Sequence, residues 1–247
     1  MAAAAEGREL TASRVLVVTA VAHEAAAVLR GVQQAFGHAG PTERTLPGGY
    51  ALTACGPVDV LVAGVGPAAA AAATATALAL APSTYGLAVS AGIAGGFAPV
   101  APVGSVVVAD AIVAADLGAQ TPDGFADVTA LGFGRVRHTT RHADTVAASL
   151  RGHGLPTAQG PVLTVSTVTG SAERAAELAQ RHPGAVAEAM EGFGLAEAAA
   201  GHDVPVLELR TVSNAVGPRD RAAWRIGEAL DALAGAFANL PWATLVP

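Results

Sequence analysis

The chain has 247 residues, of which 52% are hydrophobic and 14% are charged, and its net charge is −6. This composition excludes an intrinsically disordered chain and is sufficient for the core of one large α/β domain. Every basic residue is an arginine and no arginine cluster is longer than two residues, so the electrostatic signature of a nucleic-acid-binding protein is missing.

Two segments and the single cysteine bear on where the protein works. Residues 1–13 contain charged residues and no apolar core, so we expect a flexible tail rather than a signal peptide. Residues 60–82 are uncharged, but the Gly-Val-Gly-Pro sequence near their start predicts a strand, a turn and a helix rather than a membrane span. Cys55 cannot form an internal disulfide and fits a reducing compartment, so we expect a cytoplasmic protein without a membrane partner.

The first part of the chain alternates between strand and helix patterns. Residues 14–19, Arg-Val-Leu-Val-Val-Thr, form an apolar run that is typical of a strand buried on both faces. A helical pattern follows as far as Phe36 and has Glu24 in its first turn. A polar loop is expected over residues 37–48. Two strands joined by a Gly-Pro turn are then expected at residues 49–54 and 58–63.

The next turn does not carry a cofactor motif. The Gly-Val-Gly sequence at residues 64–66 is only part of a dinucleotide-binding fingerprint, because Ala69 replaces the third glycine and no acidic residue follows at a suitable distance. A P-loop is excluded because the chain has no lysine. His138 and His142 have Thr139 where a zinc-protease helix would carry glutamate. We therefore expect neither a cofactor nor a metal ion.

The remainder of the chain continues the alternation. Strands are expected at residues 87–92, 106–115, 160–167, 186–191 and 204–212. Helices are expected at residues 142–150, 171–181, 192–201 and 219–240, and a loop at residues 116–133. No linker or repeat interrupts the pattern. It predicts one domain over residues 14–247, a three-layer α/β/α sandwich around a mixed, twisted central sheet.

Distinctive residues follow several of these strands, at the end of the sheet where ligands bind in open α/β folds. They are Glu24, the segment Ser90-Ala91-Gly92, Glu191 and Asn214. Each has an ordinary structural explanation, because a glutamate at a helix start is favoured by the macrodipole and an asparagine suits a turn. An ionised carboxylate such as Glu191 is also well matched to the neighbouring hydroxyls of a sugar, which need an acceptor.

The order and spacing of these segments resemble the nucleoside phosphorylase superfamily, and most closely its methylthioadenosine/S-adenosylhomocysteine nucleosidase branch. The family's segment after the first strand, Gly-Ala-Met-x-x-Glu, corresponds to residues 19–24. Its Gly-(Ile/Val)-Gly turn corresponds to residues 64–66, and its Ser-Ala-Gly to residues 90–92. Its Glu-Met-Glu appears as residues 189–191, and its Ile-Ser-Asp as Val-Ser-Asn at residues 212–214.

Within that superfamily the chain is most similar to the futalosine hydrolases. The similarity rests on Gly-Ile-Ala-Gly-Gly-Phe at residues 92–97, Ala-Asp-Leu-Gly-Ala at 115–119 and Ser-Asn-Ala-Val-Gly at 213–217. It implies hydrolysis of the N-glycosidic bond of futalosine, an inosine-like nucleoside with a carboxybenzoyl group, in menaquinone biosynthesis. The products would be hypoxanthine and dehypoxanthine futalosine. It also implies a homo-oligomer, a dimer or larger.

The resemblance assigns roles to individual residues. Glu24 would activate water as the general base, and Glu191 would accept hydrogen bonds from the ribose hydroxyls. The sugar and base would be bound by residues from several elements, namely Ser90, Ala91, Gly92, Val168, Thr169 and Met190. Asn214 takes the place of an aspartate that protonates adenine. An amide cannot act as an acid, but its NH₂ can donate to N7 or O6 of hypoxanthine.

Alternative functions are a purine nucleoside phosphorylase, an adenine-releasing nucleosidase and a non-catalytic nucleoside-binding protein. A phosphorylase needs cationic groups for phosphate, which the turns at residues 19–22 and 64–66 do not supply. Asn214 disfavours adenine, and two positioned glutamates disfavour binding alone. The carboxybenzoyl group requires an apolar slot and a cation. The candidates for these are Phe97, Phe125 and Phe133, and Arg135, Arg137, Arg219 and Arg221.

Overall fold

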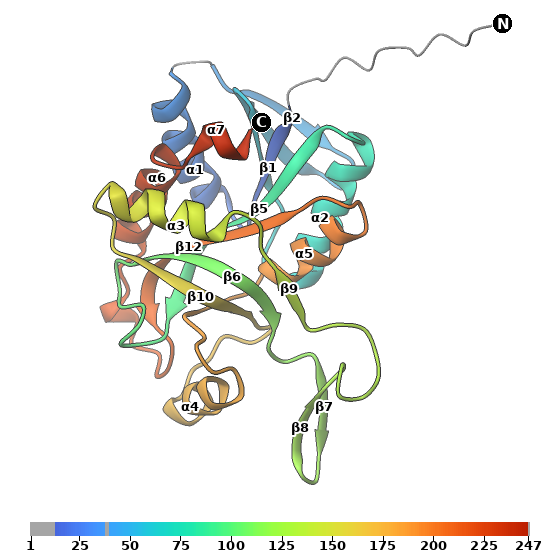
Figure 1. Cartoon of the computed structure of the whole chain (residues 1–247), viewed down its shortest axis with the longest axis vertical. Coiled ribbons are helices and arrows are strands. Elements are labelled where there is room, and N and C mark those ends of the chain that lie inside the picture. The colour runs from blue at the N-terminus through green and yellow to red at the C-terminus, as the bar shows by residue number, and fades with distance from the viewer. Residues whose placement is uncertain (1–12, 38–39, 247) are drawn as a thin grey trace, which may run out of the picture.

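The computed structural model describes residues 13–37 and 40–246 (Figure 1). Within these residues, helices cover both faces of one mixed β-sheet, and a small hairpin extends from it. This confirms the predicted three-layer α/β/α architecture. The expected flexible tail, residues 1–13, lies outside the described residues except for Ser13.

The main sheet has ten strands in the described part of the chain. They are β1 Arg14–Thr19, β2 Thr42–Leu46, β3 Tyr50–Cys55, β4 Val58–Val62, β5 Tyr85–Gly96, β6 Val106–Ala114, β9 Arg137–Thr139, β10 Thr157–Thr164, β11 Ala187–Ala189 and β12 Val206–Ala215. Their order is β11-β10-β6-β12-β5-β1-β4-β3-β2, with β9 beside β6. The parallel strands β4, β1, β5 and β12 bring their carboxyl ends to one edge, where the site forms.

The helices pack on the sheet through small apolar side chains. They are α1 Ala22–Phe36, α2 Pro67–Leu80, α3 Ala143–Gly152, α4 Ala172–Arg181, α5 Gly192–Ala200, α6 Ile226–Ala238 and α7 Trp242–Leu245. Helices α1, α3 and α6 bury their apolar residues with one face of the sheet, and α2 and α5 with the other. The alanines of α2 and α5 let these two helices approach each other closely.

Strand β11 closes part of the sheet on itself. Glu188 in β11 pairs with Leu163 in β10 and also, in antiparallel register, with Gly95 in β5. Strands β11, β10, β6, β12 and β5 therefore form a closed ring. The ring brings the ends of β5, β11 and β12 around one opening.

Three expectations from the sequence differ from the structure. The expected loop at residues 37–48 contains β2, an edge strand exposed except at Leu46, so it lacks the apolar alternation that identifies a buried strand. The expected loop at residues 116–133 contains the hairpin of β7 Gly118–Thr121 and β8 Gly124–Asp127. The expected helix at residues 219–240 begins only at Ile226, because Asp220 caps a single 3₁₀ turn at Arg221–Ala223.

No helix in the described part of the chain has both the length and the apolar character that crossing a membrane requires.

Candidate active site

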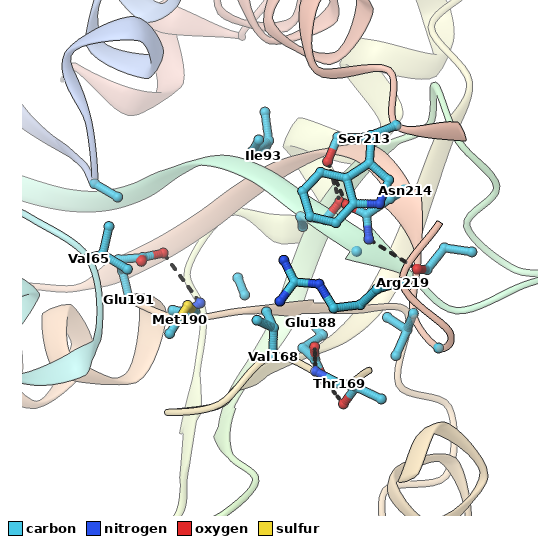
Figure 2. Close-up of a pocket in the computed structure, with 18 of the residues that line it drawn as sticks. Val65, Ile93, Val168, Thr169, Glu188, Met190, Glu191, Ser213, Asn214 and Arg219 are labelled. Carbon is cyan, nitrogen blue, oxygen red and sulfur yellow. Dashed lines mark hydrogen bonds between the residues drawn. The ribbon is translucent and has the colours of Figure 1, made fainter. Parts of the chain in front are cut away.

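A cavity of about 270 Å³ opens where the strand ends meet (Figure 2). Its walls come from the turn between β1 and α1, the end of β5, the loop after β10, strand β11 and the loop after β12. Many of the predicted site residues line it together, namely Glu24, Val168, Thr169, Met190, Glu191 and Asn214. Residues separated by almost 200 positions in the sequence therefore share one pocket.

The Glu24 carboxylate is held by backbone N–H groups from two elements. Its Oε2 accepts from Ala20 N at 3.0 Å and Val21 N at 3.2 Å, and its Oε1 accepts from Ile93 N at 2.9 Å. The bond from Val21, the N-cap residue, is half of a capping box, so the structural role of a helix-start glutamate is also fulfilled. Burial raises the pKa of Glu24, while the nearby Arg210 guanidinium and the bond from Ile93 act in the opposite direction.

Glu191 lies at the N-cap of α5 and is 6% exposed. Its Oε1 accepts from Gly66 N at 3.2 Å, and its Oε2 lies 3.2 Å from Nη1 of Arg210. The Gly-Val-Gly turn thus contributes a backbone donor rather than a phosphate cradle. The side chain of Met190 and the carboxylate of Glu191 face the same part of the cavity (Figure 2).

Arg210 in β12 connects the buried carboxylates and is not among the site residues expected from the sequence. The guanidinium is 1% exposed, and Nε donates to Oε1 of Glu208 at 2.9 Å while Nη2 donates to Oγ of Ser90 at 2.9 Å. Burial raises the pKa of Glu208, and Arg210 opposes that shift. The signal was present as Glu-Leu-Arg in a buried strand, where positions two apart share a face.

A β-bulge directs Asn214 into the cavity. The pairing of β12 with β5 shifts by one residue between Val212 and Asn214, so Ser213 is the extra residue. The Ser213 hydroxyl donates to Oδ1 of Asn214 at 2.8 Å, and Nδ2 donates to Ala215 O at 3.0 Å. These bonds orient the amide. Its NH₂ group keeps one hydrogen for a ligand.

The Ser90-Ala91-Gly92 segment lies in β5 beneath the cavity rather than at its surface. The next residues of the strand, Ile93 to Gly95, line the cavity instead. Ser90, Ala91 and Gly92, which were expected to contact the sugar and base, are therefore not among the residues that line the cavity. Ser90 accepts from Arg210, and the missing side chain of Gly92 leaves the space that the Glu24 carboxylate and the Arg210 guanidinium occupy.

Glu188 also lines the cavity and is not among the site residues expected from the sequence. Its carboxylate is buried and accepts from Thr169 N at 2.8 Å and from the Thr169 hydroxyl (Figure 2). Burial raises the pKa of Glu188, and the two bonds from Thr169 oppose the shift. Side chains alternate along a strand, so residues 188 and 190 share a face. This alternation would have placed Glu188 next to Met190 in the site.

The aromatic residue of the pocket is not one of the expected phenylalanines. Phe97 packs in a small apolar cluster, Phe125 lies under Arg181 at 4.2 Å, and Phe133 is 69% exposed in a loop. Trp224, in the loop after β12, lines the cavity.

Among the four candidate arginines, Arg219 is the one that lines the cavity. Its guanidinium lies 5.5 Å from the centre of the Trp224 ring and reaches into the pocket (Figure 2). Arg221 contacts the same ring at 6.0 Å, and Arg135 pairs with Glu197 at 3.3 Å. The other charged lining residues are carboxylates, namely Glu24, Glu188 and Glu191.

Sequence comparison relates the chain to proteins of known activity. The phosphorylase superfamily profile matches residues 14–245. A futalosine hydrolase of Streptomyces coelicolor is 60% identical over 91% of this chain and 94% of its own length. A futalosine hydrolase of Acidothermus cellulolyticus is 48% identical over 91% of this chain and 89% of its own.

Structural comparison relates the fold to nucleosidases. A futalosine hydrolase of Helicobacter pylori aligns with a TM-score of 0.77 at 18% identity, over 92% of this chain and 97% of its own. A 5′-methylthioadenosine/S-adenosylhomocysteine nucleosidase of Neisseria meningitidis, in complex with methylthio-immucillin-A, aligns with a TM-score of 0.74 at 21% identity. That alignment covers 92% of this chain and 96% of the other. At these identities the likeness concerns the fold.

Proposed function

This chain belongs to the phosphorylase superfamily and, within it, to the futalosine hydrolases, and we propose that its cavity holds futalosine while water cleaves the N-glycosidic bond. The reaction releases hypoxanthine and dehypoxanthine futalosine and serves menaquinone biosynthesis. The observation that carries the proposal is the joint lining of one cavity by Glu24, Glu191 and Asn214.

Each of these groups has a part in the reaction. The bond between C1′ and the base breaks, the sugar develops positive charge, and the base takes the electron pair. The Glu24 carboxylate takes a proton from the water whose oxygen bonds to C1′. Glu191 accepts from the ribose hydroxyls, and Nδ2 of Asn214 donates to N7 or O6 of the departing base. The base gains its proton from solvent and the protonated Glu24 returns its proton to solvent, so one water is consumed overall.

The environment of Glu24 favours water over phosphate as the nucleophile. The backbone N–H groups of Ala20, Val21 and Ile93, which could otherwise bind an anion, already donate to the Glu24 carboxylate. Three carboxylates in the lining would also repel phosphate. A phosphorylase is therefore the weaker alternative for this site.

The decisive experiment measures base release from futalosine and from inosine, each with and without phosphate. We expect phosphate-independent release of hypoxanthine from futalosine and little from inosine. Glu24→Gln should lower kcat by roughly 10²- to 10⁴-fold, the usual contribution of a general base, while ligand binding is retained. Phosphate-dependent cleavage of inosine would instead indicate a phosphorylase, and unchanged turnover in Glu24→Gln would remove that residue from the mechanism.

We assign the carboxylate of the carboxybenzoyl group to Arg219. An anionic substrate requires a cation in a cavity lined by carboxylates, and the guanidinium beside Trp224 supplies both charge and an aromatic surface. Arg219→Gln should raise KM for futalosine and leave inosine cleavage, however slow, unchanged. An equal loss with both nucleosides would mean that Arg219 contacts the part they share.

The exposed apolar residues and the single cysteine bear on assembly and location. We infer a homodimer or larger oligomer, because apolar side chains such as Phe133 and Leu131 are exposed in the segment after the β7–β8 hairpin. We infer a cytoplasmic location, because Cys55 is buried and unpaired.

A further inference from the structure

Glu188 is a buried carboxylate in the cavity that the proposed mechanism does not use. It is 4% exposed, lies in β11, and contributes to the lining between Thr169 and Met190. Figure 2 shows the side chain beside Val168 and above Thr169, across the pocket from Asn214. A carboxylate in such a place is costly to bury unless it is hydrogen-bonded, so its contacts need an explanation.

Thr169 satisfies only part of the acceptor capacity of this carboxylate. Oε1 accepts from Thr169 N at 2.8 Å and Oε2 accepts from the Thr169 hydroxyl. An ionised carboxylate has about four lone-pair sites, so two remain after these bonds. The donors from Thr169 fix the carboxylate in place, and in its ionised form it accepts hydrogen bonds and cannot donate them. The site therefore presents a fixed acceptor that cannot donate.

The two sides of the pocket have complementary hydrogen-bonding character. Asn214 offers a donor from Nδ2, which keeps one hydrogen after its bond to Ala215 O. Glu188 offers only an acceptor. A 6-oxopurine carries an acceptor at O6 and a donor at the adjacent N1–H, whereas a 6-aminopurine carries a donor at N6 and an acceptor at N1. A donor on one side and an acceptor on the other match the 6-oxo form.

We propose that Glu188 accepts the N1–H of the base and is, with Asn214, the specificity-determining residue for 6-oxopurine nucleosides. This inference rests on the proposed function in that it requires a purine nucleoside in the cavity. With a 6-aminopurine, the unprotonated N1 would face the carboxylate and the buried acceptor would lack a partner. A polar group left unpaired by the wrong base is a strong source of discrimination.

The first test compares futalosine with its 6-amino form in Glu188→Gln. The amide can donate to an unprotonated N1, so kcat/KM for futalosine should fall and that for the 6-amino form should not. We expect the ratio of the two kcat/KM values to drop roughly 10- to 100-fold, the effect of a hydrogen bond to a charged group. The matched control is Glu228→Gln, since that side chain is 74% exposed in α6 and should leave the ratio unchanged.

A merely structural role for Glu188 makes a different prediction. If the carboxylate only held the loop at Thr169, the substitution would lower kcat/KM for both nucleosides by the same factor and would leave the ratio unchanged. That result would overturn the proposal. Thr169→Val, which keeps the carboxylate and removes the hydroxyl donor, should reduce the ratio less than Glu188→Gln does.

The second test needs neither a variant nor turnover. Calorimetric binding of free bases to the wild-type protein should rank hypoxanthine above adenine and above 1-methylhypoxanthine, which lacks N1–H. Equal affinity for hypoxanthine and both other bases would overturn the assignment even if Glu188→Gln failed to fold. Absence of futalosine cleavage together with a retained preference for hypoxanthine would contradict the proposed reaction and leave the Glu188 assignment intact.

Discussion

At the scale of single residues, Glu24 combines a structural and a chemical role. Its carboxylate accepts three backbone N–H bonds, two from the entry to α1 and one from β5, so its position is fixed before a ligand binds. Such fixing reduces the reorganisation that a general base would otherwise need. The same carboxylate is buried and lies near Glu191, and both factors disfavour its charged form.

The raised pKa of Glu24 predicts the acid side of the pH–rate profile. The base must be ionised to take a proton from water, and burial raises its pKa above the ordinary value of 4.5. The kcat/KM for futalosine should therefore rise with pH through a value above 4.5 and decline as pH falls through it. A profile of kcat/KM from pH 4 to pH 8 measures this. An acid limb centred at or below 4.5 would contradict the assignment of Glu24 as the base.

We predict that activity requires a glycine at position 92, because the absence of a side chain leaves space for two charged groups. A methyl group at this position would occupy the place of the Glu24 carboxylate and of the Arg210 guanidinium. Gly92→Ala should therefore displace Glu24 and lower kcat by at least 10-fold, while thermal unfolding shows a protein that still folds. Gly227→Ala in α6, where a Cβ meets nothing within 4 Å, is the control and should retain full activity. Full activity in Gly92→Ala would show that Glu24 tolerates displacement.

At the scale of elements, β12 determines most of the electrostatics of the site. Glu208 and Arg210 point to one face of the strand, and the bulge at Ser213 then turns Asn214 into the cavity. Arg210 compensates more than one buried carboxylate, because it also contacts Glu191. One strand therefore supplies both the charge balance behind the site and the base-binding amide.

Removal of Arg210 is predicted to destabilise the protein strongly. Arg210→Met leaves Glu208 and Glu191 as buried charges without their cation, which costs about 3–5 kcal/mol of unfolding free energy. The double variant Glu208→Leu with Arg210→Met removes one of these charges and should recover much of that loss without recovering activity. Urea unfolding and turnover of the two variants measure this. Equal stability of the single and double variants would mean that the loss of stability does not come from leaving the Glu208 charge without Arg210.

The elements also explain which features could be predicted from the sequence. The apolar runs of β1 and β5 and the Ala-rich α2 identified the α/β fold, because periodicity depends on burial alone. Glu24 and Glu191 were found because each lies at the junction between a strand and the helix that follows it. Glu188 and Arg210 were missed because a period of two gives only the face of the strand, and their roles depend on partners in other elements, such as Thr169 in the loop after β10. The edge strand β2 was missed because it lacks a buried face.

At the scale of the whole molecule, the β7–β8 hairpin projects away from the sheet (Figure 1). It shares few contacts with the helices that cover the sheet, and exposed apolar side chains flank it, at Leu117, Leu131 and Phe133. The hairpin and its flanking residues form a projecting arm, residues 117–133. Exposed apolar groups on such an arm are costly in water and are typical of a surface that binds another protein. A second copy of the chain is the partner proposed above.

Phe133→Asp tests this role of the arm. A charge at this exposed position should oppose association, because an unpaired carboxylate in an interface carries a desolvation cost. We expect sedimentation equilibrium to give a dimer or larger species for the wild-type protein and a shift of at least 10-fold in the dissociation constant for the variant. Asp231→Asn, a surface change on α6 far from the arm in sequence, serves as the control. A monomeric wild-type protein, or a dimer unaffected by Phe133→Asp, would exclude the arm as the interface.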